Sequence, residues 1–104
     1  MAFIRTTTIA MSREEAEEIR PGKLVYSALI GGRKFICQTL NGLIETSVWR
    51  SVNPQGKVVI TIYTEWSTME DLQAYARQPT IRELEEQLAT EEDPLTVMVY
   101  ENIG

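Results

Sequence analysis

The chain has 104 residues and a formal net charge of -5, and its ten lysines and arginines are scattered along the sequence. This length predicts one domain over residues 1–104, and an acidic chain without a basic stripe is not expected to bind nucleic acid, because it cannot neutralise a row of phosphates. The chain has no histidine and one cysteine, Cys37, which excludes His-ligated heme, the common zinc sites and nucleophiles that depend on a histidine base, so we expect no metal and no cofactor.

The sequence also indicates the cellular compartment of the protein. No apolar run approaches the roughly 20 residues that a membrane-spanning helix needs, so we expect no membrane partner. The beginning of the sequence lacks the basic start, the long apolar middle and the small-residue cleavage site of a secretion signal. A single cysteine cannot form an internal disulfide, which agrees with a reducing compartment. These features predict a cytoplasmic protein.

The first predicted element is a strand over residues 3–11, where "RTTTIA" supplies the β-branched residues that suit a pleated sheet. Ser12 then lies three residues before Glu15, which is the spacing of a capping box, so a helix is predicted to start at Ser12. We expect this helix to be interrupted at Pro21–Gly22.

Residues 23–40 fit two structures. Their apolar side chains recur at helical spacing, which favours a second helical piece after the kink. The composition also fits two strands joined by a turn at the Gly-Gly pair, residues 31–32, so the hairpin stays open as an alternative.

Two strands joined by the turn "NPQG" are predicted over residues 43–52 and 57–66. The first alternates between a face with Ile44, Thr46, Val48, Arg50 and Val52 and a face with Leu43, Glu45, Ser47 and Trp49. The second alternates between a face with Val58, Ile60, Ile62, Thr64 and Trp66 and a face with Val59, Thr61, Tyr63 and Glu65. Because neither face of the second strand is cleanly polar, we expect both faces of the sheet to be covered.

A second helix is predicted to follow, with overlapping N-caps at Ser67 and Thr68. Its inward stripe is predicted to consist of Met69, Leu72, Tyr75 and Ala76. Pro79 is expected to interrupt this helix, and Thr80 to cap a second segment that ends before Pro94. Residues 95–103 then form the last predicted strand.

The order strand, helix, strand, strand, helix, strand predicts an α+β fold of the ferredoxin-like, split βαβ type, a four-stranded antiparallel sheet with its helices on one face. The other face would be bare in a monomer, and a second copy placed against it would form a dimeric α/β barrel. We therefore expect a homodimer through the sheet face. A monomer with a half-polar open face is the alternative.

The stretch "LNGLIETSVWRSVNPQGKVVITIYTEWSTMEDLQAYARQP" resembles the antibiotic biosynthesis monooxygenases of the dimeric α/β-barrel superfamily. The residues that fit the family pattern are Gly42, Trp49, Arg50, Glu65, Trp66, Ser67 and Pro79. More weakly, the resemblance extends from the first strand to "VMVYENI". It implies the ferredoxin-like fold, and as an activity it implies a small cofactor-independent monooxygenase or a related enzyme.

The sequence departs from two groups within this family. In members that oxidise polycyclic phenols, Trp66 has a counterpart, but their Asn, Tyr and Arg correspond here to Ile62, Leu72 and about Glu85. In heme-degrading members, an Asn, an aromatic residue and an iron-ligating His correspond to Thr7, Tyr75 and about Glu85. Because the chain has no histidine, heme degradation is not expected.

Cofactor-free oxygenation needs a dry pocket, an aromatic or apolar wall and a group that takes up a proton. The candidate catalytic residues are Trp66 as the wall, Tyr75 as a phenol donor or second wall, and Glu65 as the base, with Glu85 as another possible base. The candidate ligand-binding residues are Thr7, Ile62, Thr64 and Leu72.

Each candidate catalytic residue also has a structural interpretation. Trp66 and Tyr75 can be core residues under a helix, and Glu65 can pair with Arg50 or Arg5. Two functions therefore remain open. The first is a cofactor-independent monooxygenase or related enzyme acting on an aromatic or quinol-like compound between sheet and helices. The second is a noncatalytic dimer that binds a small apolar or aromatic ligand or a partner.

Overall fold

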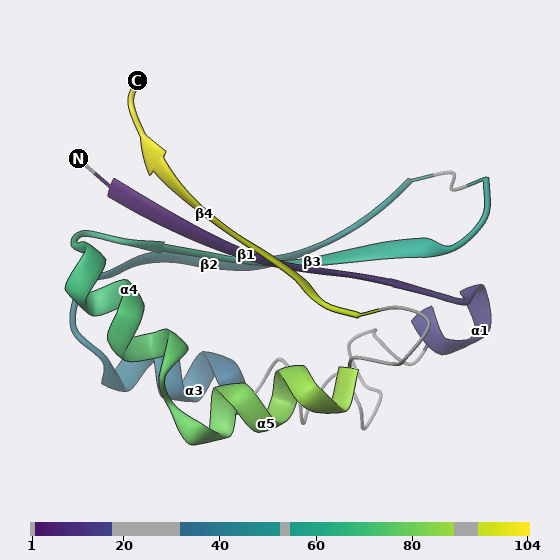
Figure 1. The fold of residues 1–104 in the computed structure, drawn as a ribbon, viewed down its shortest axis with the longest axis horizontal. Coiled ribbons are helices and arrows are strands. Elements are labelled where there is room, and N and C mark those ends of the chain that lie inside the picture. The colour runs from purple at the N-terminus through teal and green to yellow at the C-terminus, as the bar shows by residue number, and fades with distance from the viewer. Residues whose placement is uncertain (1, 18–31, 53–54, 89–93) are drawn as a thin grey trace.

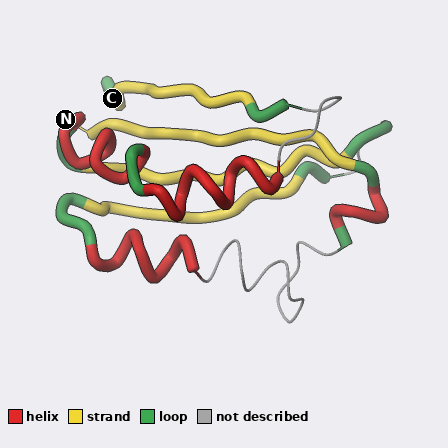
Figure 2. The backbone as a smooth tube through the Cα atoms, turned by 60° about the horizontal axis from the view of Figure 1, so that its bottom comes forward, coloured by secondary structure: helices red, strands yellow, loops and turns green. Residues whose placement is uncertain are grey.

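The computed structural model describes residues 2–17, 32–52, 55–88 and 94–104. Its centre is a four-stranded antiparallel sheet in the order β2-β3-β1-β4. The strands are β1 (Ala2–Met11), β2 (Leu43–Arg50), β3 (Val58–Trp66) and β4 (Thr96–Asn102). The helices α3 (Gly32–Thr39), α4 (Met69–Ala76) and α5 (Pro79–Leu88) lie on one face, and the short α1 (Arg13–Ala16) follows β1 (Figure 1, Figure 2). The predicted ferredoxin-like α+β fold is confirmed.

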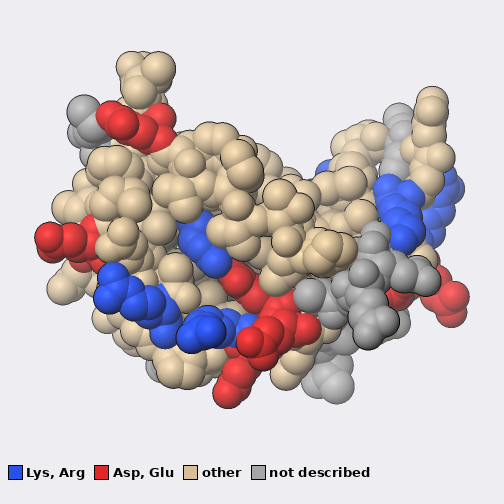
Figure 3. Space-filling model, viewed as in Figure 1, with Lys and Arg blue, Asp and Glu red and all other residues tan. Residues whose placement is uncertain are grey.

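The helix-free face of the sheet exposes apolar side chains from three strands. They are Trp49 of β2, Val59 of β3, and Met98 and Tyr100 of β4. In Figure 3 this face is the upper surface, and between its two ends it consists largely of uncharged residues. The expectation that this face of the sheet is covered as well stays a prediction.

β4 is exposed along its whole length. It runs along one edge of the sheet, and none of the described helices crosses it in Figure 2. Because Val97 pairs with Thr7 and Val99 pairs with Arg5, these two valines belong to the helix side of the sheet. The helix side of β4 is thus an exposed apolar strip at the border of the helix layer.

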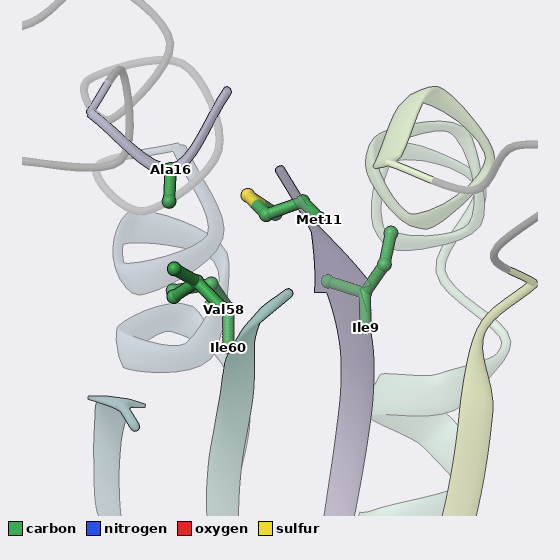
Figure 4. Close-up of a cluster of buried hydrophobic side chains, with 5 residues drawn as sticks. All are labelled: Ile9, Met11, Ala16, Val58 and Ile60. Atoms are coloured by element: carbon green, nitrogen blue, oxygen red, sulfur yellow. The ribbon is translucent and has the colours of Figure 1, made fainter. Parts of the chain in front are cut away.

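The helix side of the sheet holds two separate clusters of buried apolar residues. One lies where β1 and β3 approach α1, and in Figure 4 the side chains of Met11, Val58 and Ile60 extend toward the side of Ala16. Its members are Ile9, Met11, Ala16, Val58 and Ile60. The other lies under α3, α4 and α5 and consists of Cys37, Trp66, Leu72, Tyr75 and Ile81. The alternation predicted for β3 is confirmed, since its even-numbered residues are the buried ones.

Two of the predicted helix starts are confirmed. The Ser12 hydroxyl accepts a hydrogen bond from the backbone N–H of Glu15 at 3.1 Å, and the Thr68 hydroxyl accepts one from the backbone N–H of Asp71 at 3.1 Å. The predicted cap at Thr80 is wrong. Helix α5 already begins at Pro79, because the fixed φ of proline suits the first helical position and its missing N–H is not needed there.

Residues 32–39 form helix α3, so the hairpin alternative for residues 23–40 is wrong in this part. The helical spacing brings Ile36, Cys37 and Leu40 against the cluster around Trp66, which a strand with alternating faces could not do. The predicted kink at Pro21–Gly22 lies outside the described residues. Among the residues that the structure describes, no helix is long and apolar enough to cross a membrane.

The predicted faces of β2 are wrong for Leu43. Leu43 pairs with Trp66 and Glu45 pairs with Glu65, so a β-bulge inserts Ile44 as an extra residue. Such a bulge shifts the two-residue period, and Leu43 joins the helix side, where it packs against the cluster around Trp66. Beyond the bulge, β2 follows the predicted faces and ends at Arg50, two residues earlier than predicted.

Gly42 connects the end of α3 to β2 in a conformation that favours glycine, with φ at +84°. Its carbonyl accepts a hydrogen bond from Ser67 N at 2.8 Å, which holds the turn against the start of α4. A Cβ at this position would lie 2.6 Å from Cγ of Asp71. Asp71 could move away only by giving up its bond with the Thr68 hydroxyl, at 2.8 Å.

We predict that Gly42→Ala lowers the free energy of unfolding by about 1–3 kcal/mol, because alanine is strained at this φ and collides with Asp71. Urea denaturation followed by circular dichroism measures this change. Gly56→Ala is the matched control, since nothing lies within 4 Å of its Cβ position. It should leave stability unchanged or raise it by up to about 1 kcal/mol. Equal effects of the two substitutions would contradict the prediction.

Candidate functional site

An ion pair between Arg5 of β1 and Glu85 of α5 lies in the layer between sheet and helices. Arg5 Nη1 donates to Glu85 Oε1, and Arg5 Nη2 donates to Glu85 Oε2 at 3.2 Å. The two side chains are only 10% and 13% exposed. This two-pronged contact is the strongest geometry that a guanidinium and a carboxylate can form.

Two threonine hydroxyls complete what we call the polar cluster, which consists of Arg5, Thr7, Thr64 and Glu85. The Thr7 hydroxyl accepts from Arg5 Nη1 at 3.0 Å and donates to Glu85 Oε1 at 3.1 Å. The Thr64 hydroxyl donates to the backbone carbonyl of Arg5 at 3.3 Å. Both threonines are buried, so their hydrogen bonds have to be met within the protein.

The polar cluster lies between the two apolar clusters. Along β1 the order is Phe3 at one cluster, Arg5 and Thr7, and then Ile9 at the other. Ile62, opposite Thr7 on β3, is buried but belongs to neither apolar cluster. The apolar core is thus interrupted at the middle of the sheet, where polar side chains are placed instead.

An aromatic pair adjoins the polar cluster. Trp66 ends β3 and Tyr75 lies on α4, their ring centroids are 5.1 Å apart, and they are 0% and 1% exposed. The guanidinium carbon of Arg5 lies 5.9 Å from the centroid of the Tyr75 ring, close enough for a cation–π attraction.

The indole nitrogen of Trp66 is a buried donor. Nε1 has no hydrogen-bond partner in the described part of the chain. An unpaired buried donor costs about 1–3 kcal/mol. A ligand with an acceptor atom at this position would remove that cost.

The structure brings most of the predicted site residues together. Thr7 and Thr64 belong to the polar cluster, Trp66 and Tyr75 form the aromatic pair, and Leu72 packs in the apolar cluster around that pair. Ile62 lies on the same side of the sheet, opposite Thr7.

Glu65 lies apart from this group. Strand alternation places it on the helix-free face, where it accepts a hydrogen bond from the Tyr63 hydroxyl at 3.3 Å. The prediction that Glu65 pairs with Arg5 or Arg50 is wrong. Arg5 binds Glu85, and Arg50 Nη2 binds Glu17 at 3.4 Å. The reason is geometric, because Arg5 and Arg50 belong to the helix side of the sheet and Glu65 to the other side.

Arg5 is the site residue that sequence reasoning missed. The signal was its position, since Phe3, Arg5, Thr7, Ile9 and Met11 alternate along one face of β1. A single arginine within such an inward series requires a buried partner.

Tyr63 has a pKa that its surroundings change. Partial burial raises the pKa of Tyr63 above its ordinary 10.0, and the carboxylates of Glu65 and Glu45 raise it further. Its ring stacks on Trp49 at a centroid distance of 4.8 Å. Tyr63 is thus a neutral hydrogen-bond donor at neutral pH, on the helix-free face.

Comparison with known proteins supports the fold. No protein-family model and no curated protein matches the chain. Among solved structures, a candidate antibiotic biosynthesis monooxygenase from Deinococcus radiodurans is similar, with a TM-score of 0.71 and 16% identity over 96% of this chain and 91% of that one. A variant of SnoaB, a cofactor-independent oxygenase from Streptomyces nogalater, has a TM-score of 0.68 and 9% identity over 99% of this chain and 94% of that one.

A third solved structure is a dimeric protein of unknown function and ferredoxin-like fold from Bacteroides fragilis. It has a TM-score of 0.63 and 16% identity, and the match covers 96% of each chain. At these identities the similarity establishes the fold. The chain therefore has a ferredoxin-like fold that it shares with these proteins, which confirms the resemblance at the level of the fold.

Proposed function

We propose that the chain is a cofactor-independent monooxygenase, or a related small-molecule enzyme, that acts on an aromatic or quinol-like compound between the sheet and the helices. The observation that carries this proposal is the polar cluster beside the Trp66–Tyr75 pair, at the place where the apolar core is interrupted. Support also comes from the fold, which the cofactor-independent oxygenase SnoaB shares.

The chemistry is within reach of such a site. An acidic substrate loses a proton, and its anion passes one electron to molecular oxygen. The two radicals combine to a peroxide at the carbon atom, and loss of water leaves a carbonyl group, so that CH₂ and O₂ become C=O and H₂O. All four electrons that reduce the oxygen come from the substrate. The protein has to take up the proton, hold the ring and exclude water.

The described residues supply these parts. Trp66 and Tyr75 would form the aromatic wall, and the Thr7 and Thr64 hydroxyls would serve as hydrogen-bonding groups. Ile62 and Leu72 would contribute apolar surface. Glu65 takes no part in this site, because it faces the opposite side of the sheet.

A specific observation favours the second candidate function, a noncatalytic protein that binds a small ligand. Trp66 and Tyr75 are almost fully buried, so an aromatic compound reaches them only if α4 or α5 moves. A site closed over its aromatic residues fits the storage or sensing of a ligand.

Oxygen consumption separates the two functions. We predict that a panel of naphthols, anthrones and hydroquinones contains a substrate, and that Trp66→Phe and Tyr75→Phe lower kcat/KM by about tenfold or more, since each removes a polar group beside the reacting compound. Tyr100→Phe is the matched control, because it removes a hydroxyl on the helix-free face of the sheet, away from the polar cluster. An oxygen electrode measures the rates. No uptake across the panel would favour the noncatalytic function.

We infer further that a second copy of the chain covers the helix-free face. This face exposes Trp49, Val59, Met98 and Tyr100, and a domain of this size leaves much of its surface open without a partner. The similar protein from Bacteroides fragilis is described as dimeric. Two such faces placed together would bury these side chains and form the barrel that the resemblance implies.

Two neighbouring residues of β4 test this interface. Met98 and Val97 are 46% and 42% exposed, but the register places Met98 on the helix-free face and Val97 on the helix side. We predict that Met98→Lys shifts the protein from dimer to monomer in sedimentation velocity at micromolar concentration, because a lysine would be buried in the interface. Val97→Lys should stay dimeric. A monomeric parent protein, or equal effects of the two changes, would contradict the inference.

A further inference from the structure

We propose that Glu85 takes up the proton of a weakly acidic hydroxyl group on the ligand, and that Arg5 then holds the resulting oxyanion. The proposal rests on the proposed function through the polar cluster, because it requires a ligand at Arg5 and Glu85. It applies to a binding protein as well as to an enzyme, since the proton transfer needs no oxygen.

Stability alone does not account for a buried ion pair at this place. Removing two charges from water costs about as much as their attraction returns, and well-packed apolar residues are often as stable or more stable. Here the pair interrupts an otherwise apolar layer, and it separates two clusters that apolar side chains could have joined. This arrangement favours a role in binding.

Some N–H groups of the Arg5 guanidinium make no hydrogen bond to described residues. It makes three hydrogen bonds to described residues, one to Thr7 and two to Glu85. A guanidinium has five N–H groups. A ligand oxygen can therefore approach Arg5 while the contact with Glu85 is still in place, which is the geometry that a proton transfer between ligand and Glu85 requires.

Charge balance permits this transfer inside the protein. The ligand O–H bond breaks, the proton moves to a carboxylate oxygen of Glu85, and the electron pair stays on the ligand oxygen. Arg5 faces one negative charge before the step, on Glu85, and one after it, on the ligand. No unpaired charge is buried at any stage, and this is the condition that a site of low polarity imposes.

The acidity of the ligand limits the class of compound. A phenolate is a much stronger base than a carboxylate, so proton transfer from an ordinary phenol to a carboxylate is unfavourable in water. The geometry therefore points to more acidic hydroxyls, such as the enols of 1,3-dicarbonyl compounds, hydroxyquinones and phenols with an electron-withdrawing substituent.

The exposed helix side of β4 offers a place for the body of such a ligand. Val97 and Val99 lie directly opposite Thr7 and Arg5 in the β1–β4 register, and both are exposed. A ring lying on these valines would place its hydroxyl toward the partly accessible Arg5–Glu85 pair. The polar cluster can thus be approached from β4 without displacing the buried Trp66.

The test uses para-nitrophenol, an acidic phenol whose ionised form has its own absorption band. It is titrated into the protein at a pH at which the free probe is mostly protonated. For the parent protein we expect the phenolate band to appear on binding, without proton release to the solvent, because Glu85 retains the proton. Calorimetry in two buffers of different ionisation enthalpy counts the protons released.

Glu85→Gln removes the proton acceptor and leaves Arg5 without its counter-ion. We expect this variant to bind the phenolate with release of one proton per probe, and to bind benzoate about tenfold or more tightly than the parent does, because a ligand anion replaces the lost carboxylate. The double variant Arg5→Met/Glu85→Met should fold, since the pair is replaced by apolar residues, and should bind neither ion.

Glu17→Gln is the matched control, because it breaks the exposed pair with Arg50 and should behave as the parent does. Absence of the phenolate band with the parent protein overturns the proposal, as does a band that persists in the double variant. If Glu85→Gln does not fold, comparing the phenolate band of the parent protein with that of the double variant still tests the proposal. A phenolate band without oxygen uptake by any compound of the panel would reject the monooxygenase function and leave this proposal standing.

Discussion

The pairing of Arg5 with Glu85 is the constraint on which the arrangement of the candidate site depends. It joins residues 80 positions apart, one on the first strand and one on the last described helix. Because each charge needs the other, α5 has to lie over the middle of β1, and the Thr7 hydroxyl bridges the two charged groups. The layer is therefore apolar at both ends and polar in the middle.

The two faces of the sheet differ in the side chains that they carry. On the helix side, the alternation of β1 and β3 places polar groups and Trp66 on one face, and Tyr75 of α4 completes the aromatic pair there. On the other side, the same alternation delivers Trp49, Tyr63, Met98 and their neighbours to an open apolar surface. The first face has the features of a binding site, and the second has those of a contact between copies. β4 belongs to both, because its two sides are exposed.

Local sequence rules predicted the parts of this fold that depend on neighbours in the chain. The two-residue period of β3 and the caps at Ser12 and Thr68 follow from residues within one element. The bulge at Ile44 did not follow, because an extra residue becomes visible only through the register with the partner strand. The same limit explains why Leu43 was assigned to the wrong face.

The residues of the candidate site likewise divide into those that the sequence predicted and those that it did not. Trp66, Tyr75, Thr7 and Thr64 were predicted from inward positions and from the resemblance, and they lie together. The pairing of Arg5 with Glu85 was not predicted, because no local rule connects a strand at one end of the chain with a helix at the other. Glu65 was predicted to pair with Arg5 or Arg50, whereas the alternation of side chains along β3 places it on the opposite face of the sheet.

A crystal structure of the protein with para-nitrophenol bound tests the central claim most directly. The proposal predicts that the probe oxygen lies within about 3 Å of a guanidinium nitrogen of Arg5, with its ring against Val97 and Val99 of β4. A probe bound elsewhere, with the Arg5–Glu85 contact unchanged, would contradict it.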